Sequence, residues 1–131
     1  MKQALNETKA KLIMVANLIN KPEQTMGWHV ADYLNQIERY IGPNTIDVVL
    51  YNNELPKKDL LKKYAQDKEL PPKIEPLGFS KVPTKVVGAK LIASRPYKQD
   101  SHDKAIKRTP IRHDAIEVTK QLKKILLEQT K

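Results

Sequence analysis

The sequence predicts one α/β domain built around a mainly parallel β-sheet. Two short, uninterrupted apolar runs, at 12–16 and 46–51, are rich in β-branched residues, which is typical of strands covered on both faces. The segment between them carries apolar residues at the spacing of a helix and leaves room for a single crossover helix. Strand, helix and strand in this order form the unit from which parallel sheets are assembled.

The first strand is expected over 12–16 and, because it is apolar throughout, in the interior of the sheet. The crossover helix is expected over 29–41, since the Gly-Pro pair that follows is typical of a helix end. We expect Leu34 and Ile37 to lie in the core, on an apolar helix face that consists of Val30, Tyr33, Leu34, Ile37 and Ile41.

Three further elements are expected after the second strand. A short lysine-rich helix begins near Pro56, with its inner face at Leu60, Leu61 and Tyr64. Prolines interrupt 71–83, a strand region resumes at 86–93, and 94–112 is expected to be a loop. Asp114 begins a last helix with a capping-box-like start, and its apolar face is expected at Ala115, Val118, Leu122, Ile125 and Leu126.

Composition and charge exclude several classes of protein. The chain has 131 residues and no cysteine, so a disulfide framework, a thiol nucleophile and a cysteine zinc site are excluded. No window of about 18 apolar residues exists, and the N-terminal segment has no apolar core. The sequence therefore predicts neither a membrane span nor a signal peptide, and it predicts a single cytoplasmic domain over 1–131.

The formal net charge of +9 resides almost entirely in lysine, with 20 lysines against four arginines. Lysine lacks the planar fork with which arginine grips phosphates and guanines, and the chain has few aromatic residues on which bases could stack. A basic nucleic-acid-binding module is therefore the least favoured interpretation, and we expect no specific nucleic-acid partner.

The turn after the first strand is dense in polar groups, and in open α/β sheets ligands bind beyond the carboxyl ends of the strands. Asn17 offers an amide, Thr25 a hydroxyl, and Gly27 an unobstructed backbone at a helix N-terminus that suits a phosphate. The alternative, which the spacing alone favours, is an ordinary connecting loop in which Thr25 caps the helix.

Histidines precede carboxylates at three places. His29 and Asp32 lie at i, i+3, where they could approach a metal ion or a substrate hydroxyl, although a solvated helix face is the favoured interpretation. His102-Asp103 and His113-Asp114 are neighbours in the chain, and Asp114 is expected to be a structural cap. The sequence contains no GxGxxG, Walker lysine loop, GxSxG or HExxH motif, so a complete enzyme is not visible in it.

Three stretches resemble the CofD/YvcK-like family of phospholactate transferases and YvcK gluconeogenesis-factor proteins: KAKLIMVANLINKPEQTMGWHVADYLNQIERYIG, IDVVLYNN, and Arg112-His113-Asp114 near the end. The resemblance implies a Rossmann-like three-layer fold with a mainly parallel sheet. It also implies a ligand site formed by Asn17, Pro22, Gln24, Thr25, Gly27, Asp32, Asn52 and Asn53, with secondary candidates His29, Arg112, His113 and Asp114.

The chain departs from the family pattern in the loop. Gln24 stands where the family usually has Glu, Met26 where it usually has Asp, and Tyr33 where it usually has His. Two acidic groups that could have held Mg²⁺ are therefore neutral, which weakens Mg²⁺ binding, and no metal ligand or other cofactor is assigned. The N-terminal glycine-rich nucleotide loop of the family is absent, so the chain resembles the C-terminal part of a longer protein.

The resemblance implies a YvcK-like regulator that binds a UDP-sugar and acts in carbon metabolism and in control of the cell envelope and cell shape. The alternative is a CofD-like transferase that moves a phospholactyl-type group from a nucleotide diphosphate donor. The chain alone is not expected to be an enzyme. Its expected partners are a nucleotide-sugar or nucleotide diphosphate, the N-terminal half of the same fold and, because a sheet edge would be left unpaired, a second copy of itself.

Overall fold

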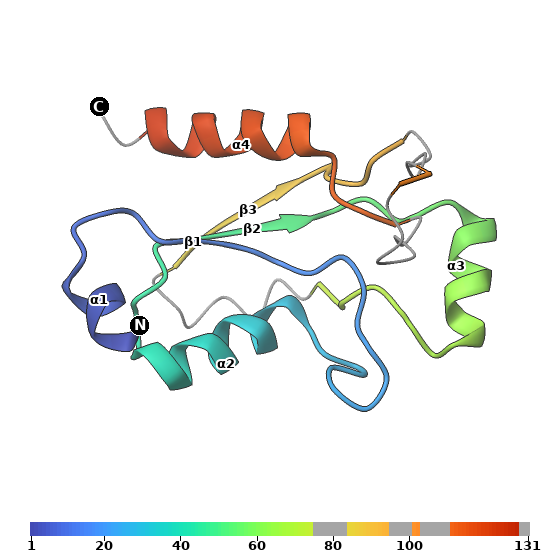
Figure 1. Ribbon diagram of the computed structural model, residues 1–131, viewed down its shortest axis with the longest axis horizontal. Coiled ribbons are helices and arrows are strands. Elements are labelled where there is room, and N and C mark those ends of the chain that lie inside the picture. Colours follow the sequence, from blue (N-terminus) through green and yellow to red (C-terminus); the bar gives the residue numbers. More distant parts are fainter. Residues whose placement is uncertain (75–83, 95–100, 103–110, 129–131) are drawn as a thin grey trace.

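The computed structural model describes residues 1–74, 84–94, 101–102 and 111–128. These residues form, in chain order, α1 (Lys2–Glu7), β1 (Ile13–Val15), α2 (Val30–Ile41), β2 (Val48–Asn52), α3 (Lys58–Gln66), β3 (Lys85–Ala89) and α4 (Ala115–Leu127). Figure 1 shows α2 and α4 on opposite sides of the sheet, with α3 beyond one end of it.

The three strands form one parallel sheet in the order β1-β2-β3. Met14 lies opposite Val49, and Leu50 lies opposite Val87. The predicted parallel pairing of the first two strands is confirmed. The prediction of an interior first strand is wrong for the described part of the chain, where β1 pairs with β2 alone. An apolar run reports that both faces of a strand are covered, and it says nothing of how many edges are paired.

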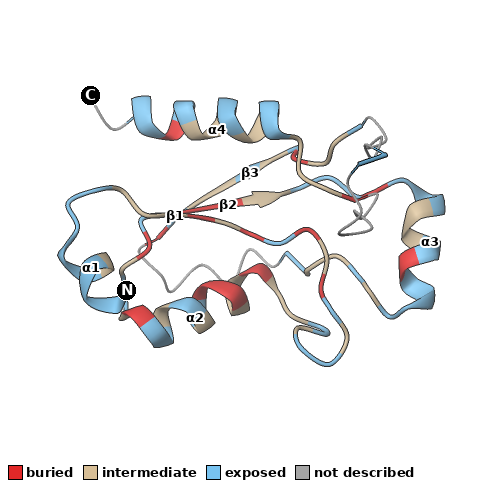
Figure 2. Cartoon of the chain, viewed as in Figure 1, coloured by how far each residue is buried: buried red, intermediate tan, exposed pale blue. Residues whose placement is uncertain are grey.

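Helices cover both faces of the sheet, so the predicted three-layer α/β fold is confirmed (Figure 2). On the α2 side, the buried cluster consists of Met14, Ala16, Val30, Tyr33, Leu34, Ile41, Ile46 and Val49. On the α4 side, it consists of Val48, Leu50, Leu91 and Ile125, with Ile13, Val15, Val87, Ala89, Val118 and Leu122 packed against it.

The crossover helix forms where the spacing predicts it, and four of its five apolar positions are buried, namely Val30, Tyr33, Leu34 and Ile41. The fifth, Ile37, was expected in the core but is 37% exposed. Its angular position lies in the middle of the apolar stripe, so the helix face itself is correctly assigned. Among the described residues, those that pack near this part of α2 cover the Ile37 side chain only in part.

The last helix begins as predicted, because the Asp114 side chain accepts hydrogen bonds from the backbone N–H groups of Ile116 and Glu117. Two residues of its expected apolar face are exposed. Leu126 is 51% exposed, because it is rotated by about 100° from the buried Ile125 and only one of the two can face the sheet. Ala115 is also exposed, since it belongs to the first turn, near the end of the sheet.

Strand boundaries differ slightly from the predictions. The second strand begins at Val48 instead of 46, and just before it the Asp47 carboxylate accepts a hydrogen bond from the Leu12 N–H at 2.8 Å. The third ends at Ala89, earlier than expected, and Ile92 then forms an antiparallel bridge with His113. Most of the expected irregular segments at 71–83 and 94–112, and Asp103, lie outside the described residues.

Candidate functional site

Three adjoining pockets lie at the edge of the sheet where the carboxyl ends of the strands meet. The inner pocket, of about 50 Å³, lies between the ends of β1 and β2 and is lined by Asn17, Val30, Asn52 and Asn53 among others. The middle pocket, of about 360 Å³, is lined by Asn17, Leu18, Ile19, Lys21, Tyr64, Ile111, Arg112 and His113. The outer pocket, of about 490 Å³, extends from Arg112 and His113 to the start of α4.

Shared residues connect the pockets. Asn17 lines both the inner and the middle pocket, while Arg112 and His113 line both the middle and the outer one. Residues about a hundred positions apart in the sequence are thus brought to one edge. The geometry unites the predicted residues Asn17, Asn52, Asn53, Arg112 and His113.

The loop after β1 is held by a residue that sequence reasoning missed. Asn20 is 2% exposed, its Nδ2 donates to the Trp28 carbonyl at 3.0 Å, and its Oδ1 accepts from the Tyr33 hydroxyl at 2.6 Å. Its backbone N–H donates to the Leu70 carbonyl at 2.8 Å. Trp28 in turn meets the Tyr33 ring edge to face, with centroids 5.1 Å apart. The loop is therefore anchored to α2 from within.

Thr25 closes a turn and does not cap α2. Its hydroxyl accepts from the Lys21 N–H at 2.8 Å, and its own N–H donates to the Lys21 carbonyl at 3.0 Å. Gly27 has φ +76°, with no heavy atom within 4 Å of where a Cβ would lie. Glycine is therefore suited to this position because it adopts a positive φ without strain, and not because a neighbouring group needs the space of a side chain.

The N-terminus of α2 is already occupied by protein groups. His29 is the N-cap, and its backbone N–H donates to the Asp32 carboxylate at 2.7 Å. The first helical N–H, that of Val30, donates to the Lys73 carbonyl at 3.0 Å. Asp32, predicted as a ligand residue, thus has a capping role, and the phosphate position predicted beside Gly27 has protein acceptors next to it.

The side chain of Asn52 is hydrogen-bonded to backbone groups. Its Oδ1 accepts from the Leu91 N–H at 3.0 Å and from the Glu54 N–H at 3.3 Å, and its Nδ2 donates to the Glu54 carbonyl. The side chain therefore ties the end of β2 to the segment after β3. Asn53, next to it, is exposed and lines the inner pocket.

The segment Arg112-His113-Asp114 crosses the carboxyl edge of the sheet. The Ala93 N–H donates to the Arg112 carbonyl at 2.9 Å, and the Asp114 N–H donates to the Leu91 carbonyl at 2.7 Å. Burial lowers the pKa of His113, and a hydrogen bond to the Ala16 backbone only partly opposes that shift. His113 Nε2 is buried and has no hydrogen-bond partner among the described residues.

The remaining predicted loop residues lie apart from the three pockets just described. Pro22 is half-buried, while Gln24 and Met26 are exposed. Within the described ranges, no group of three or more His, Cys, Asp or Glu side chains is placed to hold a metal ion. No helix in that part of the chain is long and apolar enough to cross a membrane.

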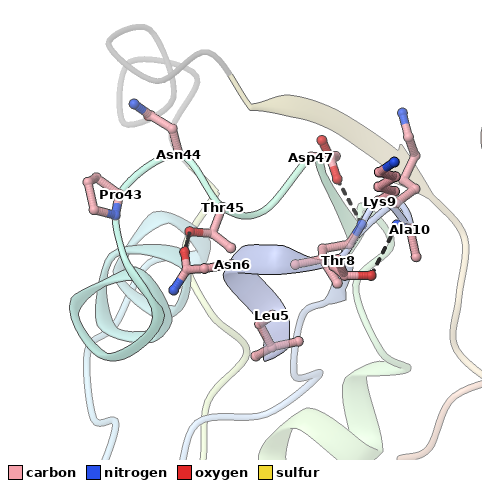
Figure 3. Close-up of a pocket in the computed structure, with 11 residues that line it drawn as sticks. Leu5, Asn6, Thr8, Lys9, Ala10, Pro43, Asn44, Thr45 and Asp47 are labelled. Atoms are coloured by element: carbon pink, nitrogen blue, oxygen red, sulfur yellow. Dashed lines mark hydrogen bonds between the residues drawn. The ribbon is translucent and has the colours of Figure 1, made fainter. Parts of the chain in front are cut away.

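A further pocket, of about 350 Å³, lies at the opposite edge, near the amino ends of the strands (Figure 3). Its polar groups largely bond to one another. Asp47 accepts from the Leu12 N–H, Thr8 accepts from the Ala10 N–H at 3.1 Å, and Thr45 donates to the Gly42 carbonyl at 2.7 Å. We therefore place the candidate site at the carboxyl edge.

An open parallel sheet with helices on both faces and polar side chains at the carboxyl ends of its strands is the architecture in which α/β proteins bind ligands. A family model described as "2-phospho-L-lactate transferase CofD" matches residues 1–92. The chain therefore belongs to the CofD family.

Curated relatives match almost the whole chain. A "Putative gluconeogenesis factor" from Thermotoga maritima is 27% identical over 124 residues, which are 95% of this chain and 36% of the relative. The "Gluconeogenesis factor" of Bacillus subtilis is 26% identical over 121 residues, or 91% of this chain and 34% of the relative. The chain thus spans about a third of the length of these two proteins and is YvcK-like within its family.

The fold matches a crystal structure of a UPF0052-family protein from Bacillus halodurans. The TM-score is 0.75 at 18% sequence identity, over 92% of this chain and 35% of the other. The three-layer arrangement is therefore the fold of that protein over the matched part.

Proposed function

We propose that the chain forms one wall of a nucleotide-sugar site in a YvcK-like protein, and that it serves binding and regulation in carbon metabolism and cell-envelope control. The observation that carries the proposal is the meeting of Asn17, Asn53, Arg112 and His113 around adjoining pockets at the carboxyl edge. Membership of the CofD family and similarity to gluconeogenesis factors support it.

The chemistry of these side chains suits such a ligand. The guanidinium of Arg112 presents a planar set of donors that fits a diphosphate. The amides of Asn17 and Asn53 both donate and accept, as hydroxyl groups of a sugar and edges of a base require. The middle and outer pockets, of about 360 and 490 Å³, fall in the range of about 300–1,000 Å³ typical of small-molecule sites.

The experiment is calorimetric titration with UDP-glucose. We expect weak or undetectable binding by the isolated chain, because it spans about a third of its relatives and the first helical N–H of α2 is already bonded to Lys73. A chimera in which this chain replaces the matching region of the Thermotoga maritima relative should bind. Micromolar binding by the isolated chain would mean that the site is complete without the rest of the fold.

Variants of the chimera locate the site. Arg112→Gln should weaken binding of UDP-glucose by about tenfold or more, since a charge-assisted hydrogen bond contributes about 1.5–3 kcal/mol. Lys123→Gln, on the exposed side of α4, is the matched control and should leave affinity unchanged. A chimera that does not bind, or equal effects of the two substitutions, would contradict the proposed function.

The second candidate is a transferase that moves a phospholactyl-type group from a nucleotide diphosphate donor. The match to the family model of 2-phospho-L-lactate transferase CofD favours it. Release of nucleotide monophosphate by the chimera in the presence of such a donor and an alcohol acceptor would support transfer chemistry. Binding of UDP-glucose without that release would support the regulatory proposal.

The net charge of +9 gives a prediction about nucleic acids. We expect the isolated chain to bind duplex and single-stranded DNA only non-specifically in a gel-retardation assay, with Kd of about 10⁻⁴–10⁻⁶ M at physiological salt. Part of the lysine charge is paired, as in Lys21 with Glu69 at 2.9 Å and Lys85 with Glu128 at 2.6 Å. Nanomolar binding that depends on DNA sequence would contradict the last place given to a nucleic-acid-binding function.

A further inference from the structure

The inference concerns His113, a residue that lines both the middle and the outer pocket. Its backbone is fixed on both sides, because Arg112 and Asp114 each hydrogen-bond to the segment after β3, and His113 itself bridges Ile92. The ring also forms a hydrogen bond with the backbone of Ala16, the residue before Asn17. His113 is therefore held at the junction of three segments that form the edge.

The ring has one hydrogen-bonding position that the protein does not fill. Nε2 is buried and unpartnered among the described residues. Buried polar groups in native proteins are nearly always paired, and leaving one unpaired costs about 1–3 kcal/mol. An unfilled position on a residue that lines two pockets points to a group supplied from outside the chain.

The protonation state of the His113 ring determines whether the outside group must donate or accept a hydrogen bond. A neutral imidazole carries one N–H, and a backbone carbonyl such as that of Ala16 requires this N–H as its donor. Because Nε2 has no partner among the described residues, Nδ1 is the nitrogen that donates to Ala16, and Nε2 is the bare acceptor. Burial lowers the pKa of His113, which keeps the ring neutral near pH 7. The diphosphate diester of a nucleotide-sugar is fully ionised at pH 7 and has no proton to give such an acceptor, whereas a hydroxyl or an amide N–H has one.

We propose that His113 recognises the sugar end of the ligand, accepting a hydrogen bond from a sugar hydroxyl or amide, and that it does not contact the phosphates. This rests on the proposed function for the identity of the ligand, and it divides the site: Arg112, its neighbour, is the residue suited to phosphate, while His113 sets specificity for what the nucleotide carries.

The test follows the imidazole nitrogens of His113 by NMR in the isolated chain, with the resonances assigned by their loss in His113→Gln. Glucose and dimethyl phosphate, a phosphate diester that carries no proton at pH 7, are the probes. We expect one nitrogen to report a bare acceptor at pH 7 and to shift when glucose is added at high concentration, with no shift for dimethyl phosphate. The proposal would be overturned by a shift with the phosphate probe, by the absence of a shift with both probes, or by a doubly protonated ring.

Calorimetry on the chimera provides the second readout. His113→Phe should weaken the binding of UDP-glucose by about tenfold and leave the affinity for UDP unchanged. His113→Gln retains a hydrogen-bond acceptor and should therefore lose less affinity for UDP-glucose. An equal loss for UDP and UDP-glucose would overturn the assignment of His113 to the sugar. A glucose-dependent NMR shift without any UDP-glucose binding would instead contradict the proposed function and leave this inference standing.

Discussion

At the scale of single residues, the polar side chains of the carboxyl edge divide into two kinds. Asn20, Asp32, Asn52 and Asp114 are bonded to the chain itself and hold the loops and helix ends in place. Asn17, Asn53, Arg112 and His113 line the pockets without such a structural role, whereas Asn52 and Asp114 also line a pocket but have their side chains bonded to the backbone. The first kind fixes the positions of the second, since a binding residue is only as well placed as the backbone that carries it.

The pair Asn20 and Tyr33 gives the first prediction. Tyr33→Phe removes the 2.6 Å hydrogen bond and leaves the buried Asn20 amide oxygen unpaired, which should cost about 1–3 kcal/mol in urea unfolding followed by circular dichroism. Tyr40→Phe is the control, because Tyr40 is 70% exposed, and it should be neutral. Equal effects of the two substitutions would show that the Asn20 contact contributes no stability.

His113 gives a prediction about pH. Because burial places its pKa below the ordinary value of 6.5, the unfolded chain binds more protons than the folded one as pH falls through that range. Stability should therefore decrease from pH 7 toward pH 5. His113→Gln should remove this part of the slope. Identical pH profiles for the variant and the original chain would contradict the assignment.

At the scale of elements, much of the fold could be predicted from the sequence because periodic patterns report burial. The apolar run at 12–16 and the spacing within α2 identified a parallel pair and its crossover helix, and Asp114 marked the start of α4. Edge position could not be predicted, because a strand covered on both faces has the same composition whether one or two of its edges are paired.

The site was predictable only in part, for a similar reason. The position of Asn17 after a strand placed it at the ligand edge. The resemblance named Asn52, but the sequence does not show that its amide is used by the backbone of Leu91. Asn20 left one signal, a polar residue directly after the apolar pair Leu18-Ile19, which does not distinguish a buried anchor from a solvated loop residue.

α2 gives a prediction at this scale. Leu34 is fully buried, so Leu34→Ala should cost about 2–5 kcal/mol through cavity formation. Ile37→Ala, at a position 37% exposed on the same helix, should lower the free energy of unfolding of the isolated chain by clearly less. Thermal or urea unfolding of both variants measures the difference. A larger loss for Ile37→Ala would mean that this side chain is covered in solution, by a second copy or by segments outside the described ranges.

At the scale of the whole molecule, the main feature is that β1 pairs on one side only within the described part of the chain. The Ala16 N–H and the Leu12 carbonyl bond to β2, so by alternation the backbone of Val15 points to the open edge. No charged residue or proline interrupts 12–16. Edges without such protection pair readily with other strands.

We therefore predict that the isolated chain self-associates through β1 as its concentration rises, which light scattering would measure. Val15→Pro should shift the chain toward monomer, because it removes an outward N–H and leaves the bonds to β2. Ile116→Lys, at a position 82% exposed on α4, is the control and should have no effect. A strictly monomeric original chain, or dissociation by Ile116→Lys alone, would contradict association through this edge.

The contact between Trp28 and Tyr33 has an optical consequence. Trp28 is the only tryptophan of the sequence, and it lies where the loop after β1 enters α2, half-buried against a tyrosine that is itself bonded to Asn20. Its emission therefore comes from a single place, two residues before Val30, which lines the inner pocket. Any ligand or partner that rearranges the loop should change the colour or intensity of this emission, so the protein carries its own fluorescent reporter and requires no attached dye.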